Sequence, residues 1–522
     1  MKRFNVTGTC FPEKHYMVDI SSNLNAMHKM VDEGIYFTIN RGRQYGKTTT
    51  LSGLNEKLEK AGYIVFSISF EAVGEEAYES EECFYKSFLW LLSRQITYGL
   101  VKNAGDELVE LLEKYADNED GISWKQMDML ISRMCSISPG KVVVMIDEVD
   151  QAGNFQVFLK FLGLLRSKYL SRDRIPTFHS VILAGVYDIK NLKLKLRSDE
   201  EHQLNSPWNI AVGYDKDMSL SEAGIAGMLS EYEADHSTGM DVAAMAKRLR
   251  DYTSGYPFLV SRLCQIMDAE EKEDSWTAEG FQRAVKAILG ESNTLFDDMV
   301  KKLVQFPKLH DMLYEILYTG RRVTFNRDDR EINIAGMFGY IYDKNGAVAI
   351  ANRILEMRLY NLFVTEASKV DDIYRSGSVD RTQFIKDGVL DMKRILERFV
   401  WHYTEIYGDR DERFHEKEGR KFFLFYLKPI INGTGNSYVE AETLDEGRMD
   451  VVVDYLGKQY VIELKIWRGP AYHEEGEKQL AGYLDSMHLD HGYMLTFNFN
   501  QKKENGVQER FLDGKRIYEA FV

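Results

Sequence analysis

Apolar and polar positions follow two different periods along this chain. Short apolar runs, each typical of a buried parallel strand, occupy residues 35–39, 64–70, 142–146 and 180–184. Amphipathic stretches such as 85–98 and 153–169 lie between these runs. Strands that alternate with helices predict βαβ units, and therefore a parallel sheet covered by helices over residues 1–220.

The pattern becomes helical over residues 221–290, where Ser221 followed by Glu222 is a helix-start signal. Residues 291–366 combine helical patterning with two apolar runs around Asn345-Gly346, which is a strong hairpin signal. Helices plus a hairpin suggest a winged-helix module. The polar stretch 367–381 is the expected linker to a last domain, which spans residues 382–522 and begins with a long helix.

Two short apolar strands near the C-terminus carry charged residues. Residues 447–453 include Asp450, and residues 460–465 end in Glu463-Leu464-Lys465. Alternation along a strand puts Glu463 and Lys465 on the same side. Two carboxylates and an ammonium are costly in a core, but they fit a face that binds a divalent metal. Taken alone, the spacing is more typical of solvated side chains on an ordinary antiparallel sheet.

Composition narrows the class of protein. The chain has 522 residues, with 44% hydrophobic and 28% charged residues, which is typical of a soluble globular protein with several domains. A net charge of −15 argues against a general nucleic-acid coat, but local basic patches and metal ions can still bind phosphate. We expect free thiols, because the four cysteines are scattered along the sequence. We also expect a cytoplasmic protein with no membrane partner, because the sequence has no apolar run of membrane-spanning length and no signal-peptide core.

A phosphate-binding loop is expected after the first strand. Gly46-Lys47-Thr48 lies between a strand and a helix pattern, so backbone N–H groups would hold phosphate, Lys47 would reach the terminal phosphates, and Thr48 would bind Mg²⁺. The usual first Gly is replaced by Arg41. The expected ATP-binding loop residues are Arg41, Gly42, Arg43, Gln44, Tyr45, Gly46, Lys47, Thr48 and Thr49.

The strand at 142–146 ends in two acids that complete this nucleotide site. Asp147 would join the Mg²⁺ shell together with Thr48, and Glu148 would orient the attacking water. Asp150 is expected to be solvated or to cap a helix. Arg172 and Arg174 precede the next strand, where a neighbouring subunit can insert an arginine, although ordinary surface arginines fit these positions equally well.

The N-terminal half resembles the AAA-like, STAND-type P-loop ATPases. The resemblance rests on the loop from Arg41 to Thr48, on the Val-Val-Val-Met-Ile-Asp-Glu stretch that ends at Glu148, and on Gly255-Tyr256-Pro257 ahead of the winged-helix pattern. It implies an ATPase core at 1–220, a helical lid at 221–290 that senses the nucleotide through Gly255 to Pro257, and a winged helix at 291–366. Homo-oligomerisation through the ATPase domain also follows from this resemblance.

The last domain, 382–522, resembles PD-(D/E)XK phosphodiesterases. The matching stretches include Arg448 to Val453, Ile462 to Trp467 and Glu477 to Leu484. The resemblance implies an α/β nuclease-like fold that binds one or two Mg²⁺ ions, or Mn²⁺, through acidic side chains and a backbone carbonyl. A lysine and residues on helices would assist phosphodiester cleavage. The implied metal ligands are Asp450, Glu463 and the Leu464 carbonyl, and the implied assisting residues are Lys465, Gln479 with Tyr483, and Glu416, with Glu418 as the alternative to Glu416.

Together, these features favour an ATP-regulated, Mg²⁺-dependent nuclease. The expected partner is nucleic acid, with DNA favoured and RNA left open, and the resemblance points to bacterial defence or mobile-element biology. The alternative is a signalling or scaffold ATPase whose C-terminal domain binds nucleic acid or protein without cleaving it. A third possibility is an ATP-binding switch with negligible turnover.

Overall fold

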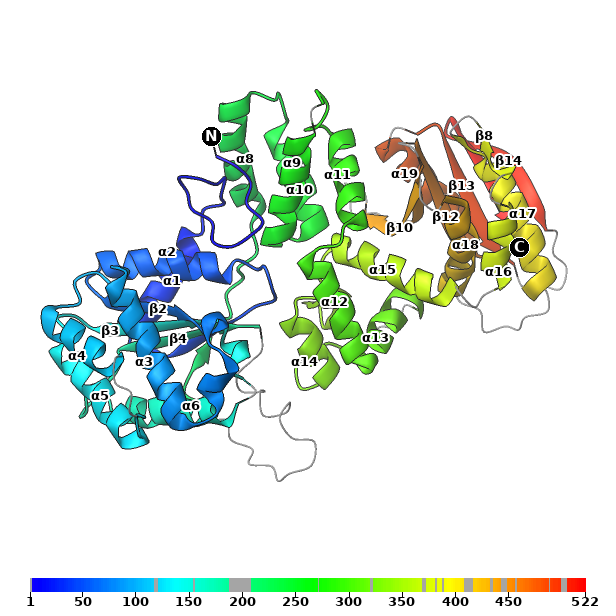
Figure 1. The fold of residues 1–522 in the computed structure, drawn as a ribbon. Coiled ribbons are helices and arrows are strands. Elements are labelled where there is room, and N and C mark those ends of the chain that lie inside the picture. Colours follow the sequence, from blue (N-terminus) through cyan, green and yellow to red (C-terminus); the bar gives the residue numbers. More distant parts are fainter. Residues whose placement is uncertain are drawn as a thin grey trace. The chain divides into compact units, whose positions relative to one another are not determined.

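The computed structural model in Figure 1 describes most of the chain. The described residues are 2–116, 121–153, 155–186, 208–270, 272–319, 323–368, 372–380, 383–386, 389–407, 416–431, 435–442, 448–455, 458–487, 489–498 and 505–522. They form two compact units. The first comprises Met1–Phe281 and Asn333–Tyr340, and the second comprises Gln282–Ile332 and Ile341–Val522.

The first unit is an α/β domain followed by helices. Its elements are α1 (Ser21–Asp32), β1 (Phe37–Asn40), α2 (Lys47–Lys60), β2 (Ile64–Ser69), η1 (Phe70–Ala72), η2 (Glu75–Tyr78), α3 (Glu81–Thr97), α4 (Asp106–Ala116), α5 (Trp124–Ile137), β3 (Val142–Asp147), η3 (Val149–Gln151), α6 (Gln156–Leu170), β4 (Ser180–Gly185), β5 (Val212–Gly213), α8 (Glu222–His236), α9 (Val242–Thr253) and α10 (Pro257–Ala269). Ser221 accepts a hydrogen bond from the Gly224 N–H, so it caps α8 as predicted.

All strands of the first unit that the structure describes run parallel, in the order β2-β3-β4-β1-β5. The four strands expected from the apolar runs are therefore confirmed. Strand β5 was not expected, because it has only two residues and carries no apolar run. Parallel pairing brings the carboxyl ends of β1, β3 and β4 to one edge of the sheet.

Helices cover both faces of this parallel sheet (Figure 1). Strand β2 shows the division, because alternate side chains enter different cores. Ile64, Phe66 and Ile68 pack in a core with α3, α5 and α6, whereas Val65 packs in a core with α1 and α2. A strand buried on both faces needs an unbroken apolar sequence, which explains why the runs lack polar alternation.

The second unit combines helices, a hairpin and a larger sheet. Helix α11 (Ala278–Gly290) begins in the first unit and continues into the second. Helix α14 (Arg330–Met337) belongs to the first unit from Asn333 on. The further elements of the second unit are α12 (Thr294–Gln305), α13 (Pro307–Tyr314), η5 (Glu315–Thr319), β6 (Ile341–Lys344), β7 (Ala347–Ile350), α15 (Arg353–Ser368), α16 (Asp372–Asp380), β8 (Ile385–Lys386), β9 (Val389–Leu390), α17 (Met392–Tyr407), α18 (Glu416–Ile431), β10 (Gly435–Glu442), β11 (Arg448–Tyr455), β12 (Lys458–Ile466), α19 (Pro470–Ser486), β13 (His491–Phe497), β14 (Gly506–Leu512) and β15 (Lys515–Phe521).

The hairpin predicted around Asn345-Gly346 is confirmed. Strands β6 and β7 pair antiparallel, and Asn345 and Gly346 have φ angles of 53° and 80°. Two consecutive left-handed residues match the twist of the flanking strands, which is why Asn-Gly is favoured there.

The segment 367–381, which was expected to be a linker, instead contains the packed helix α16. Its Gly377 lies so close to α18 that an added Cβ would be 2.1 Å from the Tyr426 carbonyl oxygen. On the same helix, Asp380 is buried and accepts hydrogen bonds from the Tyr426 hydroxyl and from His402 Nε2, each at 2.8 Å. The polar composition therefore reflects a buried polar contact and a close backbone approach, and not a solvated connection.

The larger sheet of the second unit has the order β10-β11-β12-β13-β15-β14. Strands β10 to β12 are antiparallel, β12, β13 and β15 are parallel, and β14 returns antiparallel. Helix α18 packs on one face, where Gly419 lies against the Phe497 ring. Helix α19 packs on the other face, where Gly476 lies against the Lys465 side chain (Figure 1).

None of the described helices is long and apolar enough to span a membrane. All four cysteines are free thiols, as expected, although only Cys264 is buried.

Candidate functional site

The loop between β1 and α2 closes around the side chain of Lys47. Gly46 has a φ of 80° and is the last residue before the first turn of α2. The Lys47 ammonium donates hydrogen bonds to the carbonyls of Arg41 and Gly42, each at 3.1 Å. The loop backbone therefore curves around a buried cation at a helix N-terminus, which is a favourable geometry for holding phosphate.

The acid at the end of β3 lies beside the start of α2. The Thr48 hydroxyl donates a 2.7 Å hydrogen bond to Asp147 Oδ2, and Asp147 Oδ1 accepts one from the Glu148 N–H at 2.9 Å. The two halves of the nucleotide site, about a hundred positions apart in the sequence, are thus brought together by the parallel sheet. A hydroxyl beside a carboxylate is a pair of oxygen ligands that suits Mg²⁺.

Burial shifts the pKa of two groups at this site. Burial lowers the pKa of Lys47, against the opposing effect of Glu148 and Asp147. Burial also raises the pKa of Glu148, against the opposing effect of Lys47. Glu148 has a φ of 52°, an uncommon backbone conformation for a residue with a side chain. A carboxyl group with a raised pKa at a strained position is typical of a group that handles protons.

Arg41 occupies the loop position where glycine is usual, and its side chain is anchored by backbone carbonyls. Its guanidinium donates hydrogen bonds to the carbonyls of Asn40, Tyr214 and Lys216, at 2.8, 3.1 and 2.7 Å. The arginine therefore ties the start of the loop to the segment that follows β5. This anchoring gives a physical reason why the chain tolerates a large residue at this position.

The Gly255-Tyr256-Pro257 turn contacts the same loop. The Tyr256 hydroxyl donates a hydrogen bond to the Arg43 carbonyl, and the rings of Tyr256 and Tyr45 meet edge to face at 4.8 Å. Gly255 has a φ of 71°, and a Cβ there would lie 2.1 Å from the Leu220 carbonyl oxygen. The helices after residue 220 are therefore in direct contact with the loop backbone, a contact that the sequence located only as a Gly-x-Pro pattern.

The other charged residues singled out near this site have different surroundings. Asp150 is half-buried and accepts a hydrogen bond from the backbone N–H of Val186, the residue after β4. The Arg172 guanidinium lies 3.9 Å from the Tyr169 ring centroid and donates to the Tyr169 carbonyl. Arg172 and Arg174 follow α6 and precede β4, at the edge of the sheet opposite the loop.

In the second unit, three predicted residues meet on the α19 side of the sheet. The Lys465 ammonium is 2.9 Å from Glu463 Oε1 and donates a 3.0 Å hydrogen bond to Gln479 Oε1. Glu463 is 2% exposed, whereas Gln479 is exposed on α19. A Cβ at Gly476 would lie 2.9 Å from Lys465 Cε, so this glycine lets α19 approach the lysine. The simple alternative of a solvated sheet face therefore does not apply to Glu463.

Strand register relates Asp450 to this cluster. Val451 of β11 pairs with Ile462 of β12 in an antiparallel ladder. Continuing this register by one residue places Asp450 opposite Glu463. Alternation assigns both to the face opposite that of Val451 and Ile462. The side chains of Asp450, Glu416 and Glu418 lie outside the described part of the structure. The Leu464 side chain has no ligating atom, so only its backbone carbonyl could serve as a ligand.

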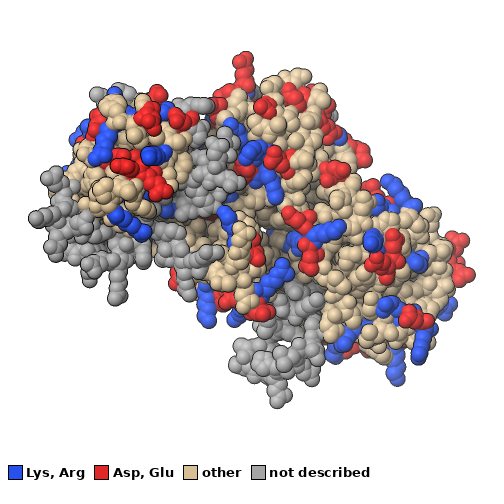
Figure 2. All heavy atoms as spheres, turned by 180° about the vertical axis from the view of Figure 1, so that it is seen from behind, with Lys and Arg blue, Asp and Glu red and all other residues tan. Residues whose placement is uncertain are grey.

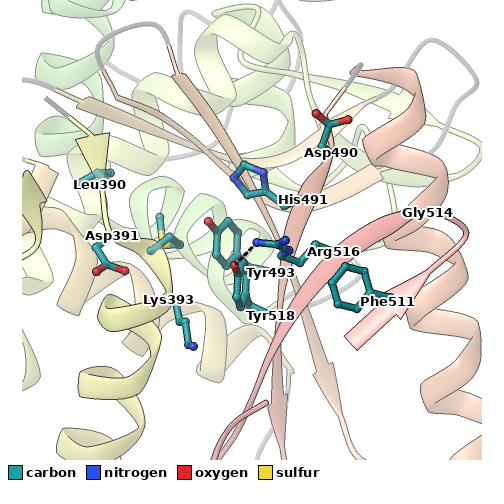
Figure 3. Close-up of a pocket in the computed structure, with 11 residues that line it drawn as sticks. Leu390, Asp391, Lys393, Asp490, His491, Tyr493, Phe511, Gly514, Arg516 and Tyr518 are labelled. Atoms are coloured by element: carbon teal, nitrogen blue, oxygen red, sulfur yellow. Dashed lines mark hydrogen bonds between the residues drawn. The ribbon is translucent and has the colours of Figure 1, made fainter. Parts of the chain in front are cut away.

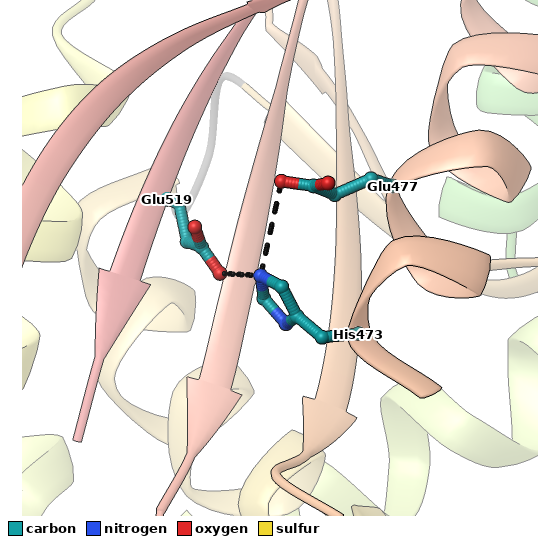
Figure 4. Close-up of side chains that lie close together, drawn as sticks. All are labelled: His473, Glu477 and Glu519. Carbon is teal, nitrogen blue, oxygen red and sulfur yellow. Dashed lines mark ion pairs between the residues drawn. The ribbon is translucent and has the colours of Figure 1, made fainter. Parts of the chain in front are cut away.

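A second charged cluster, which the sequence did not suggest, lies on the same sheet face (Figure 4). His473 Nε2 is 2.7 Å from Glu519 Oε1 and 3.8 Å from Glu477 Oε1. These three groups are close enough together to hold a metal ion. The Arg510 guanidinium, however, contacts both glutamates, at 3.1 and 3.5 Å, and balances their charge. The i,i+4 spacing of His473 and Glu477 was the available sequence signal, but their partner Glu519 becomes visible only in the fold.

Lys and Arg are interspersed with Asp and Glu on the face of the molecule drawn in Figure 2. The described residues on this face show no continuous basic band.

Solved structures similar to this chain include two from archaea. The solved structure of a Walker-type ATPase, PABY2304 of Pyrococcus abyssi, is 14% identical, with a TM-score of 0.46, over 68% of this chain and 99% of that one. The ORC2 protein of Aeropyrum pernix is 12% identical, with a TM-score of 0.34, over 70% of this chain and 97% of that one.

No curated protein matches the chain. The family model described as "AAA-like domain" matches residues 11–352, which is more than half of the 522 residues. This match includes both halves of the nucleotide site and supports a P-loop ATPase core. The chain therefore belongs to the AAA-like domain family.

Proposed function

We propose that the chain is an ATP-regulated, Mg²⁺-dependent phosphodiesterase that cleaves nucleic acid, with DNA as the favoured substrate. The observation that carries the proposal is the contact of Lys465 with both Glu463 and Gln479 on a buried sheet face, next to Asp450 in register. A lysine held between a carboxylate and an amide has a fixed position, which a charge-stabilising group needs.

In the first unit, the loop and the β3 acids would bind and hydrolyse ATP. Loop N–H groups and Lys47 would hold the phosphates. Thr48 and Asp147 would hold Mg²⁺, which neutralises phosphate charge when it is bound. Glu148 would orient a water molecule and accept its proton, a role that the raised pKa of this carboxyl supports.

In the second unit, Asp450, Glu463 and the Leu464 carbonyl would hold Mg²⁺ or Mn²⁺, which would supply an acidified water. Lys465 would stabilise negative charge as it develops on the scissile phosphate, and Gln479 would hold the Lys465 ammonium in place. Glu416 or Glu418, at the start of α18, would complete the ligand set. Tyr483, four residues after Gln479 on α19, would contact the phosphate backbone.

The lid and the winged-helix module, which lie between the two sites in the sequence, would connect them. We assign residues 221–290 to a lid, 291–366 to a winged-helix module and 382–522 to the nuclease-like domain. Homo-oligomers formed through the ATPase core would place Arg172 or Arg174 near a neighbour's nucleotide.

Metal-dependent cleavage of supercoiled plasmid, single-stranded DNA and RNA by the full chain tests the proposal. We expect Mg²⁺ or Mn²⁺ to support cleavage by the wild type, and Asp450→Ala and Lys465→Ala to lower the rate at least a hundredfold. Lys458→Ala, which removes an exposed lysine from the same strand, is the matched control. Equal rates for Lys465→Ala and Lys458→Ala would exclude the assigned site.

Control by ATP is tested separately with Lys47→Ala. This variant should lose ATP binding and the effect of ATP on cleavage, while metal-dependent cleavage without ATP stays intact. Loss of cleavage in both conditions would argue for a structural defect, which the thermal unfolding midpoint of the variant would reveal.

The alternative is a scaffold ATPase whose second unit binds without cleaving. The net charge of −15 and the interspersed charges on the face in Figure 2 favour this alternative. It predicts that Lys47→Ala abolishes assembly and that no substrate is cut with either metal. A comparison of phosphate release by wild type and Glu148→Gln separates a true ATPase from a nucleotide-binding switch.

A further inference from the structure

A pocket of about 490 Å³ opens on the sheet face opposite Lys465 (Figure 3). Its wall includes Tyr493 of β13 and Tyr518 of β15, which are paired in register. Tyr493 is also paired with Ile462 of β12. Glu463, the next residue along β12, belongs to the other face by alternation. The pocket is therefore separate from both sites described above, and its volume falls within the usual range for small-ligand sites.

Aromatic rings form one side of this pocket. Tyr493 and Tyr518 stack with their centroids 5.5 Å apart and an interplanar angle of 19°. Tyr493 is buried, and burial raises the pKa of its hydroxyl, so the hydroxyl stays protonated at neutral pH. Phe511 at the outer end is 69% exposed. Phe511 pairs in register with Arg516, two residues before Tyr518, so its exposed ring lies on the same sheet face as the stacked pair and offers a surface on which a planar ligand can stack.

Cationic groups flank these rings. The Arg516 guanidinium lies 5.5 Å from the Phe511 centroid, donates a 3.4 Å hydrogen bond to the Tyr518 hydroxyl and pairs with Glu509 at 3.2 Å. The Lys393 ammonium lies 5.6 Å from the Tyr518 centroid. Within the described residues, Lys393 has no recorded carboxylate partner, so its charge is open to an anionic ligand.

Hydrogen-bond acceptors complete the lining. Figure 3 shows Asp391 and Lys393, at the start of α17, facing His491, Tyr493, Tyr518 and Arg516 from across the pocket. Asp490 lies beside His491. One Asp391 oxygen caps the first turn of α17 through the Arg394 N–H at 3.1 Å. A ligand for this pocket therefore needs an anionic group for the cations, a planar ring for the aromatic wall, and N–H or O–H donors for the two carboxylates.

We propose that this pocket binds a nucleotide, either free or as a unit of a single strand. The phosphate lies between Lys393 and Arg516, the base stacks on Phe511 beside Tyr518, and amino or hydroxyl groups donate to Asp391 and Asp490. A simple inorganic anion satisfies only the cations, and an apolar ring satisfies only the aromatic wall. This site is independent of the proposed phosphodiesterase activity.

Binding is measured on the full chain carrying Lys47→Ala, in EDTA, so that neither the phosphate loop nor a metal-dependent site contributes. The probes are AMP, a 5′-phosphorylated single-stranded tetranucleotide and inorganic phosphate. We expect Lys393→Gln with Arg516→Gln to weaken binding at least tenfold, and Phe511→Ala to weaken it about fivefold through lost stacking. All three side chains are exposed, so folding should not change, and Lys458→Gln is the control for a lost surface charge.

The two sources of the nucleotide give different results. AMP binding that is lost in the double variant identifies a free nucleotide as ligand. Tetranucleotide binding that is lost in the double variant, with no AMP binding, identifies a unit of a single strand. The proposal is overturned if neither probe binds, if the double variant matches Lys458→Gln, or if inorganic phosphate competes as well as AMP.

Discussion

The hydroxyl of Tyr256 donates a hydrogen bond to the backbone carbonyl of Arg43, and this contact joins the helices after residue 220 to the phosphate-binding loop. Any change in the loop backbone that moves the Arg43 carbonyl also changes this bond. The Gly-x-Pro turn supports the geometry, because Gly255 fits against Leu220 and Pro257 starts α10.

Tyr256→Phe removes this hydrogen bond and keeps the ring that packs on Tyr45. We expect the free energy of unfolding of the first unit to fall by about 1 kcal/mol, and ATP to protect α8 to α10 less strongly against amide hydrogen exchange. Urea denaturation and hydrogen exchange check the two effects. Tyr98→Phe, at an exposed tyrosine, should leave both unchanged, and ATP protection equal to wild type in Tyr256→Phe would contradict the coupling.

The raised pKa of Glu148 predicts a pH dependence with a definite sign. As a proton acceptor Glu148 must be ionised, so ATP hydrolysis should fall on the acid side at a pH above the ordinary glutamate value of 4.5. Because the folded state favours the protonated form, the ionised carboxyl is unfavourable to folding at neutral pH. Glu148→Gln should therefore unfold at a higher temperature than wild type at pH 7.

The gain from Glu148→Gln should shrink as the pH falls through the raised pKa of the folded state, and it should be absent below the ordinary value of 4.5, where the carboxyl is protonated in both states. Thermal melts across pH 4 to 8 measure this trend. Glu113→Gln, at an exposed position of α4, should show no such change. A stability gain independent of pH would show that charge burial is not its cause.

Two glycines of α19 provide a matched pair for the second unit. A Cβ at Gly476 would lie 2.9 Å from Lys465 Cε, whereas nothing lies within 4 Å of a Cβ at Gly482. Gly476→Ala should displace the lysine from Glu463 and Gln479 and lower the proposed nuclease activity about tenfold or more. Gly482→Ala should retain activity and raise stability by up to about 1 kcal/mol. Equal activity of the two variants would contradict a positioning role for Lys465.

Asp380 connects α16 to α17 and α18, and its contribution to stability should depend on pH. Burial alone would raise its pKa, but hydrogen bonds from His402 and Tyr426 outweigh burial and lower it. A lowered pKa means that this stabilisation is present above the ordinary value of 3.8 and is lost as the pH falls through the folded value.

Asp380→Asn should therefore destabilise the second unit by about 1–3 kcal/mol at pH 7, with a smaller difference near pH 3. Denaturant titrations at both pH values check this. Asp372→Asn on the same helix, where the carboxylate is 71% exposed and pairs with Arg375, should cost much less.

The sequence pattern was sufficient to predict those parts of the fold that are determined by residues close together in the sequence. Strands β1 to β4 are buried on both faces and therefore have continuous apolar sequences. The loop that contains Lys47 follows β1, and the acids Asp147 and Glu148 lie at the end of β3. Because parallel strands end at the same edge of the sheet, the contact between this loop and these acids could be predicted. The Asn345-Gly346 turn is specified by two adjacent residues.

Other features depend on partners that are distant in the sequence. Strand β5 is defined by pairing with β1 and has no pattern of its own. Helix α16 has a polar sequence because Asp380 and Gly377 meet α17 and α18, which a single-sequence pattern cannot distinguish from a linker. The contact of His473 with Glu519 joins two segments 46 positions apart, and composition gives no sign of it.

Helix α19 makes two separate polar contacts with the sheet face that it covers, Gln479 to Lys465 and His473 to Glu519. The two contacts are six residues apart on one helix that packs on β12 and β13. A ligand that displaces Gln479 together with α19 would therefore also move His473 relative to Glu519, although the two contacts share no residue.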